Sequence, residues 1–561
     1  MNCLTDAVIA HAFAQVGNRR VHYARGGEGP PLIMLHAAPC SAKVMRPIQE
    51  VFAARFTTFA FDLPGCGLSD PLPAGPLTTE DLADAILATL DALGLGRVLA
   101  YGRHTGAGVA VELAHRHPDR VAMVLTDGFP VFTAPMSEQR IHENLPPIVP
   151  RWDGTHLLWC WYRYREQHIF APWDRPLAEC RADTDVPDPD FLHRGTVELL
   201  EAGDEYRRIF ASAFRHAGLG MIGALQVPVC FGTRPGDSLH SSRTLYPPEA
   251  WTEVLPREQI AAAMREREIL SRHAQGLPAA PPHAGRLAPG AGGIDYLQTP
   301  AGETLVRAYG LERERMPVVV LHDIPGASAL DDALLRELGT LRPSIGFDLS
   351  GLGESAPPPG QAISVGLWVE QLRAVCRSLG LERVHLLAQG AAAAVAAEAA
   401  LAAPGLVAGL TLRSPPILTP ALRRDFLDHP IPAADPVEDG SHLLRLWHQL
   451  RDQELFFPWF RRTRDHARGN APRLQPEALQ ARARACLKQP RNLAPAWATA
   501  MAYPLEQRLA QLRAAVALAS HPADIFAPRA AAAASFLGRE ALPMPEDAGL
   551  AASTLDQSIG P

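Results

Sequence analysis

RVLAYGRHTGAGVAVELAHRH, residues 97–117, is the stretch of the chain that decides the fold. It opens with an apolar run suited to a buried strand, turns between glycines at positions 102 and 106, and continues as a helix of small residues. Upstream lie two further apolar runs and a helical pattern at 78–95, in which Thr79 is the expected N-cap. Strands that alternate with helices in this way predict an α/β protein whose mostly parallel sheet is covered by helices on both faces.

The same unit occurs twice in the 561-residue chain. A shift of 286 residues takes LIMLHAAP (32–39) to VVVLHDIP (318–325) and FDLPGCGLS (61–69) to FDLSGLGES (347–355). The same shift takes DGTHLLWCWYRYREQHIFAPW (153–173) to DGSHLLRLWHQLRDQELFFPW (439–459). Nearly one register held over roughly 200 residues indicates a tandem duplication, copy one followed by copy two.

The segment between the copies is rich in alanine, proline and glycine, which is typical of a semi-rigid linker. We expect a first domain at residues 1–275, a linker at 276–291 and a second domain at 292–561. In each copy an aromatic and polar insertion breaks the alternation of strands and helices. It predicts helical caps at about 135–220 and about 420–505.

Composition and charge exclude several kinds of partner. The net charge is −7, 47% of the residues are hydrophobic and no uninterrupted apolar run approaches a membrane span, which argues against nucleic acid and membranes. The eight cysteines are scattered and form no CxxC pair, which favours reduced thiols over a metal site or disulfides. We expect a cytoplasmic protein with a small-molecule substrate, no cofactor and no metal, whose two domains pack against each other.

The order of HAAP, DLPGCGLSD, a strand–glycine–helix turn, a helical insertion and a late PGD turn resembles the α/β-hydrolase superfamily. The turn GRHTGA also resembles a little-characterised group that has histidine there. In the superfamily this turn reads Gly-x-Ser-x-Gly and presents a nucleophilic serine. Here His104 takes the serine position in copy one, and Gly390 takes it in copy two. The resemblance implies a hydrolase-type fold for both copies and an inactive second copy.

The resemblance also implies the partners of His104. Asp237 takes the place of the triad acid, with Asp524 as its counterpart in copy two, and Asp127 takes an alternative acid position. The backbone N–H groups of Ala38 and Thr105 would form the oxyanion hole. No histidine follows the last strand, so His104 itself is the candidate base or nucleophile. We interpret the nearby histidines as exposed residues without a catalytic role, namely His240 and His273.

The cap offers weaker candidates. His156, Trp161 and Arg165 have identical partners in copy two, which favours a structural role for most of the repeated set, but we retain all three as candidate substrate contacts. Cys40 and Cys66 are expected on loops at the rim of the cleft, where a thiolate would need a neighbouring cation or base.

These observations predict an atypical hydrolase that acts on a small apolar ester-, lactone- or epoxide-like substrate through His104. Two alternatives stay open at this stage: a non-catalytic pseudo-hydrolase that binds a small molecule, and a cofactor-independent lyase on the same fold.

Overall fold

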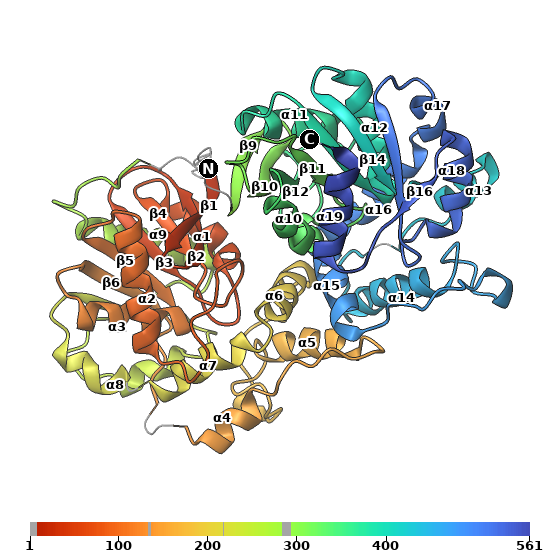
Figure 1. Ribbon diagram of the computed structural model, residues 1–561. Coiled ribbons are helices and arrows are strands. Elements are labelled where there is room, and N and C mark those ends of the chain that lie inside the picture. Colours follow the sequence, from red (N-terminus) through yellow and green to blue (C-terminus); the bar gives the residue numbers. More distant parts are fainter. Residues whose placement is uncertain (1–7, 133–135, 217, 283–292, 433, 561) are drawn as a thin grey trace. The chain divides into compact units, whose positions relative to one another are not determined.

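The computed structural model describes residues 8–132, 136–216, 218–282, 293–432 and 434–560 (Figure 1). The chain divides into two compact units. Unit 1 comprises Met1–Val149 and Trp159–Ala284, and unit 2 comprises Pro150–Leu158 and Gly285–Pro561. The short segment Pro150–Leu158 comes from copy one of the sequence but is grouped with unit 2. Most of the predicted linker, from residue 283 onward, lies outside the described residues.

Unit 1 is built on an eight-stranded sheet with the order β1-β2-β4-β3-β5-β6-β7-β8. β1 and β2 are antiparallel to each other and β2 is antiparallel to β4, whereas all pairs from β4 to β8 are parallel. β3, β4 and β7 are buried at every position, as expected for strands covered on both faces. The strands are β1 Ile9–Val16, β2 Arg19–Gly26, β3 Pro31–Leu35, β4 Thr57–Phe61, β5 Val98–Arg103, β6 Val121–Asp127, β7 Val229–Thr233 and β8 Thr252–Val254.

Helices cover both faces of this sheet and create two apolar cores. α2 (Thr79–Ala92) and α3 (Thr105–Arg116) contribute to one core, and α1 (Arg46–Phe52) and α9 (Gln259–Arg272) contribute to the other. The expected N-cap of α2 was wrong by one residue. Thr78 is the cap, because its side chain accepts a hydrogen bond from the N–H of Asp81 while the Asp81 carboxylate accepts one from the N–H of Thr78.

The chain between β6 and β7 is mainly helical. It contains α4 Glu138–Asn144, α5 Thr155–Glu166, α6 Pro189–Ala202, α7 Glu205–Arg215 and α8 Gly218–Met221.

Unit 2 repeats the topology of unit 1. Its sheet has the order β9-β10-β12-β11-β13-β14-β15-β16, which is the unit 1 order with each strand replaced by its counterpart. The strands are β9 Gly293–Thr299, β10 Gly302–Tyr309, β11 Val318–Leu321, β12 Ser344–Phe347, β13 Val384–Gln389, β14 Val407–Arg413, β15 Ala515–Ser520 and β16 Ala541–Pro543. The helices are α10 Asp332–Gly339, α11 Val365–Ser378, α12 Ala393–Ala402, α13 Pro420–Asp428, α14 Ser441–Leu455, α15 Pro476–Leu487, α16 Leu493–Ala502, α17 Leu505–Leu509, α18 Ala530–Leu537 and α19 Ala548–Ile559.

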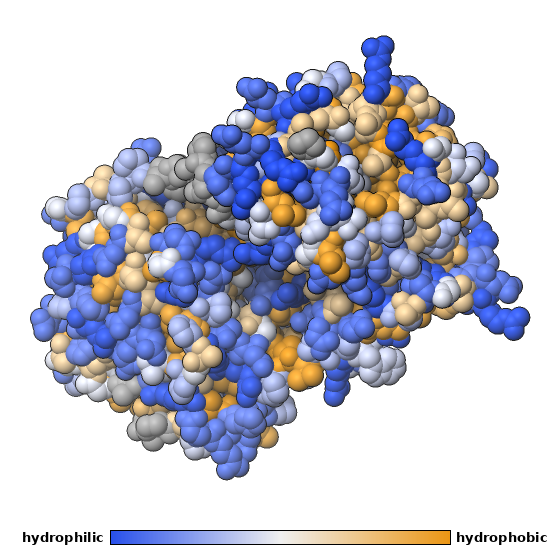
Figure 2. Space-filling view, in the orientation of Figure 1, coloured by the Kyte–Doolittle hydropathy of each residue, from blue (hydrophilic) through white to orange (hydrophobic). Residues whose placement is uncertain are grey.

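The surface of each unit is largely hydrophilic on the face that Figure 2 shows, with apolar residues in small separate areas. Within the described part of the chain, no helix combines the length and the apolar character needed to cross a membrane.

Candidate active site

His104 occupies a strained turn between β5 and α3. Its backbone has φ 46° and ψ −113°, and Ser414 is the one other non-glycine residue with positive φ in the described ranges. A Cβ added to Gly102 would lie 2.4 Å from the Gly106 carbonyl oxygen, and one added to Gly106 would lie 2.2 Å from the Leu35 carbonyl oxygen. The turn is therefore packed directly against β3. Strain of this kind persists where the surrounding structure imposes it.

The imidazole of His104 contacts Asp237 directly. Its Nε2 lies 2.9 Å from Asp237 Oδ2 and 3.1 Å from Oδ1, and its side chain remains 31% exposed. Asp237 follows β7, and its Oδ1 accepts a hydrogen bond from the N–H of Leu239. Burial raises the pKa of Asp237, but the His104 imidazole and the Leu239 N–H outweigh it and hold this pKa well below its usual value. Asp237 is therefore an ionised partner for His104.

Gly128, at the end of β6, leaves the space that this contact needs. A Cβ at residue 128 would lie 2.8 Å from His104 Cδ2 and 3.3 Å from Asp237 Oδ1. The backbone of Gly128 also has φ 77°, a value that side chains disfavour.

Asp127 contacts arginines. Its Oδ2 lies 3.1 Å from Arg103 Nε and 2.8 Å from Arg234 Nη2, and its Oδ1 accepts a bond from Arg234 Nε. The carboxylate is 2% exposed, so this ion-paired group ties the end of β5 to the loop after β7. The geometry favours a structural role for Asp127, because Asp237 orients His104.

Unit 2 shows what the oxyanion-hole positions can bind. The residues equivalent to Ala38 and Thr105 are Ile324 and Ala391, and both of their backbone N–H groups donate to Asp323 Oδ1, at 2.8 and 2.9 Å. Two donors at these positions therefore converge on one carboxylate oxygen. Copy one has Ala37 in place of Asp323, and alanine has no polar group that could occupy this place.

The turn of unit 2 is built around that carboxylate. A Cβ on Gly390 would lie 2.4 Å from Asp323 Oδ1, so no side chain fits there. Ser414 takes the place of Gly128, and its hydroxyl donates to Asp524 Oδ2 at 2.8 Å. Arg413 takes the place of Asp127 and binds both oxygens of Asp524. Unit 2 keeps the acid and surrounds it with groups that cannot act as a base at neutral pH.

The three cap residues singled out from the sequence are held by structural contacts. His156 belongs to the segment grouped with unit 2, and its Nδ1 accepts a hydrogen bond from the N–H of Arg151. Its counterpart His442 accepts the same kind of bond from Val437. Trp161 is fully buried, and Arg165 pairs with the adjacent Glu166 at 2.5 Å.

His168 is a candidate that the sequence analysis missed. Its ring lies 5.0 Å from the ring of Tyr164 and 5.2 Å from that of Phe191, and its buried Nε2 has no hydrogen-bond partner among the described residues. Burial lowers the pKa of His168 to about 4, and the charges of His104 and Arg103 add to the effect. The imidazole is therefore neutral. One signal was available: His168 becomes Glu454 in copy two, although its surroundings are well preserved.

The cysteines and the other histidines of copy one are poor candidates. Burial raises the pKa of the Cys40 thiol to about 12 and that of Cys66 well above its usual value, so neither is a thiolate. His240 Nδ1 lies 2.9 Å from the Thr233 hydroxyl, and His273 follows α9 beside the ring of Trp251. In the described residues, no group of three or more His, Cys, Asp or Glu side chains could hold a metal ion.

We predict that Gly128→Ala separates His104 from Asp237, because the new methyl group overlaps the imidazole. A crystal structure of the variant should show the Nε2–carboxylate contact broken. Gly94→Ala is the matched control, because Gly94 also has positive φ (65°) but has nothing within 4 Å of an added Cβ. If both variants keep the contact, the space at residue 128 does not control His104.

We also predict that Asp323→Asn stabilises the protein more at pH 8 than at pH 5. Burial raises the pKa of Asp323 to about 7 in the folded protein, partly offset by the N–H groups of Ala391 and Ile324. The folded state therefore holds a proton that the unfolded state releases near pH 4, and stability falls as the pH rises towards 7. Asparagine keeps the accepting oxygen without the charge. Thermal melts should show a gain on the order of several degrees at pH 8; an equal gain at both pH values would contradict this assignment.

The comparisons with known proteins agree with this architecture. A family model described as "alpha/beta hydrolase fold" matches residues 30–160 and again residues 316–462, once in each copy. A putative non-heme haloperoxidase of Mycobacterium phage D29 is 39% identical over 128 residues, which are 22% of this chain and 43% of that protein. A soluble epoxide hydrolase of Corynebacterium sp. (strain C12) is 32% identical over 113 residues, 20% of this chain and 39% of that protein. The chain thus spans about two fifths of the length of these curated relatives.

Among solved structures, epoxide hydrolase A from Mycobacterium thermoresistibile is similar with a TM-score of 0.38 and 17% identity, over 48% of this chain and 99% of that one. The two segments matched by the family model contain the first parallel strands and the turn of each sheet. The strand order is the same in both sheets. The chain therefore belongs to the α/β-hydrolase superfamily and carries two hydrolase-like domains.

Proposed function

We propose that unit 1 is an atypical hydrolase in which His104, oriented by Asp237, activates water for attack on a small, largely apolar ester or lactone. The observation that carries the proposal is the contact of 2.9 Å between the His104 imidazole and the Asp237 carboxylate, made from a strained turn. In this arrangement a histidine stands where the superfamily has serine, and it reaches the acid without an intervening residue.

The contact with Asp237 fixes the role of each ring nitrogen. Because the carboxylate of Asp237 is ionised, it accepts the proton of His104 Nε2, which leaves Nδ1 with a free electron pair. Water loses a proton to Nδ1 as its oxygen forms a bond to the carbonyl carbon of the substrate. Asp237 stabilises the imidazolium that results. The proton then passes from Nδ1 to the leaving alkoxide as the bond from carbon to that oxygen breaks.

The backbone N–H groups of Ala38 and Thr105 would stabilise the negative oxygen of the tetrahedral intermediate. Support comes from unit 2, where the two equivalent groups bind one carboxylate oxygen at 2.8 and 2.9 Å. Donors that converge on a single oxygen favour ester and lactone substrates over epoxides, because carbonyl attack creates a negative charge at one oxygen.

Geometry favours water over direct attack by the histidine. Nδ1 is bonded to the ring carbon that carries the rest of the side chain, so a bulky acyl group meets the turn backbone, whereas a water molecule does not.

The cap of unit 1 supports a small substrate with one polar group. The neutral His168 packs against the rings of Tyr164 and Phe191, and its Nε2 could make one hydrogen bond to a substrate. The soluble epoxide hydrolase of Corynebacterium, one of the relatives, is named for hydrolysis of a small functional group.

We predict that His104→Ala and Asp237→Asn each lower turnover of short-chain esters and lactones by about 10²- to 10⁴-fold, the usual contribution of general acid–base catalysis. Initial rates over a panel of p-nitrophenyl esters and γ- and δ-lactones would measure the loss. Asp524→Asn, the same change in copy two, is the matched control and should keep the rate. Full activity in His104→Ala would refute the proposal, and a panel with no turnover by the wild type would favour a protein that only binds its ligand.

We further predict that Ala37→Asp abolishes this turnover, because in unit 2 the aspartate at this position occupies both backbone donors. Ala37→Ser is the control, because its hydroxyl is too short to reach them and should retain most of the rate. Comparable rates in the two variants would show that the donors do not take part.

A further inference from the structure

The cavity of unit 2 has a volume of about 440 Å³, the size of a small-molecule site. It lies where the turn at Gly390 and the loop of Asp524 meet the cap helices α14 and α15. Part of its wall is apolar, formed by Leu330, Leu334, Leu450, Ile525 and Phe526. Since the turn has no side chain, hydrolysis of the kind proposed for unit 1 does not account for this cavity.

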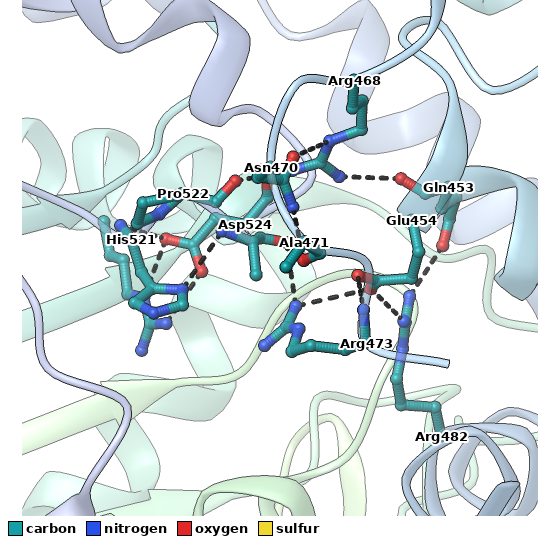
Figure 3. Close-up of polar contacts among 12 residues, drawn as sticks. Gln453, Glu454, Arg468, Asn470, Ala471, Arg473, Arg482, His521, Pro522 and Asp524 are labelled. Atoms are coloured by element: carbon teal, nitrogen blue, oxygen red, sulfur yellow. Dashed lines mark hydrogen bonds and ion pairs between the residues drawn. The ribbon is translucent and has the colours of Figure 1, made fainter. Parts of the chain in front are cut away.

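Two arginines of the cap line the cavity and share one carboxylate (Figure 3). Glu454 is fully buried, and its Oε1 accepts a hydrogen bond from Arg482 Nη1 at 2.7 Å and one from Arg473 Nη2 at 3.4 Å. The buried Nε of Arg473 has no partner among the described residues. Two guanidinium groups on one carboxylate leave an excess positive charge at the wall of the cavity.

A third arginine adds to this excess. Arg468 donates to the carbonyl oxygens of Gln453, Pro522 and Asp524 and to the side-chain oxygen of Asn470, all of which are uncharged. Among the described residues Arg468 hydrogen-bonds to no carboxylate, although the nearby charges of Glu454 and Asp524 partly offset its own.

The floor of the cavity contributes little net charge. Arg413 and Asp524 neutralise each other at 2.8 and 2.9 Å, and Asp331 accepts a hydrogen bond from Gln389. Burial raises the pKa of both Asp331 and Asp323, to about 7 for Asp323, so Asp323 is partly protonated at neutral pH. The remaining ionisable groups of the lining are His322, His521 and Glu546.

Copy one has no counterpart of this cationic wall. The position of Glu454 is His168 in copy one. When the first residues of α6 and α15, Pro189 and Pro476, are aligned, the positions of Arg473 and Arg482 become Val186 and Gly195. Gly195 packs against the ring of Tyr164, which leaves no room for a side chain. The arginines are thus specific to unit 2.

We propose that the cavity of unit 2 is a binding site for a small organic acid, whose carboxylate is held by Arg473 and Arg482 and whose apolar part lies against Leu450 and Phe526. The ligand is bound and not turned over. This site is independent of the chemistry proposed for unit 1. Arginine suits the task, because its planar fork pairs with both oxygens of a carboxylate.

Isothermal titration calorimetry of the full chain with hexanoate, benzoate and phenylacetate, each beside its neutral amide, tests the proposal. At least one acid should bind at micromolar to millimolar concentration, about tenfold or more tightly than its amide. Arg473→Gln should weaken that binding about tenfold, whereas Arg473→Lys, which keeps the charge but loses the planar fork, should weaken it less. In each of these variants Arg482 remains paired with Glu454, and thermal melts would verify the fold.

Asp323→Asn and His104→Ala complete the design. Removal of the Asp323 charge should tighten binding of the acid, and His104→Ala should leave it unchanged because that residue belongs to unit 1. The proposal is overturned if no acid binds, if amides bind as well as acids, or if Arg473→Gln binds like the wild type. Weaker binding of the acid in Asp323→Asn would contradict the charge argument and would overturn the proposal equally. Loss of ester turnover in His104→Ala bears only on unit 1.

Discussion

A turn follows β5 in unit 1, and an equivalent turn follows β13 in unit 2. The space beside each turn has room for a single side-chain group, and the character of both candidate sites depends on which group occupies it. The turn of unit 1 is packed onto the first parallel strand, where Gly106 contacts the carbonyl of Leu35. His104 fills the space in unit 1, and Gly128 keeps the opposite wall clear. In unit 2 the Asp323 carboxylate fills it, and any side chain at Gly390 would overlap that carboxylate. Three pairs of equivalent residues are involved: His104 and Gly390, Gly128 and Ser414, and Ala37 and Asp323. The residues at these positions can therefore change only together.

Because different groups occupy this space, the equivalent acids Asp237 and Asp524 have different partners. Asp237 faces an imidazole, the side chain that most often transfers protons in catalysis. Asp524 faces the guanidinium of Arg413 and the hydroxyl of Ser414, which hold it as a fixed ion pair. The acid follows the equivalent strand in both copies, β7 and β15, although the loops differ in sequence, TRPGD (233–237) against SHPAD (520–524). Whether the acid supports proton transfer depends on the residue that the turn presents to it.

The cap shows the same division between a common scaffold and a few variable positions. The repeated histidine in the first turn of α5 and α14 accepts a hydrogen bond from a backbone N–H in each copy, so its identity in both reflects local structure and not shared chemistry. One position near the end of these helices differs, His168 in copy one and Glu454 in copy two. A neutral imidazole leaves the first site apolar, whereas a buried carboxylate recruits Arg473 and Arg482 and makes the second site cationic.

The motifs of the sequence implied the α/β-hydrolase fold by resemblance, and the sequence by itself determined the duplication, the strands β3 to β5 and the turn at His104. These features depend on local patterns of apolar residues and glycines, which repeat along the chain and need no knowledge of distant contacts. Only the tertiary structure decided that Asp127 pairs with arginines, that Asp323 binds the two backbone donors, and that Pro150–Leu158 groups with unit 2. It also revealed the buried His168, whose pKa the charge of His104 helps to lower. Such contacts join residues far apart in the chain. Each charged group has several possible partners, and the packing of side chains, not a local sequence pattern, decides which partner it contacts.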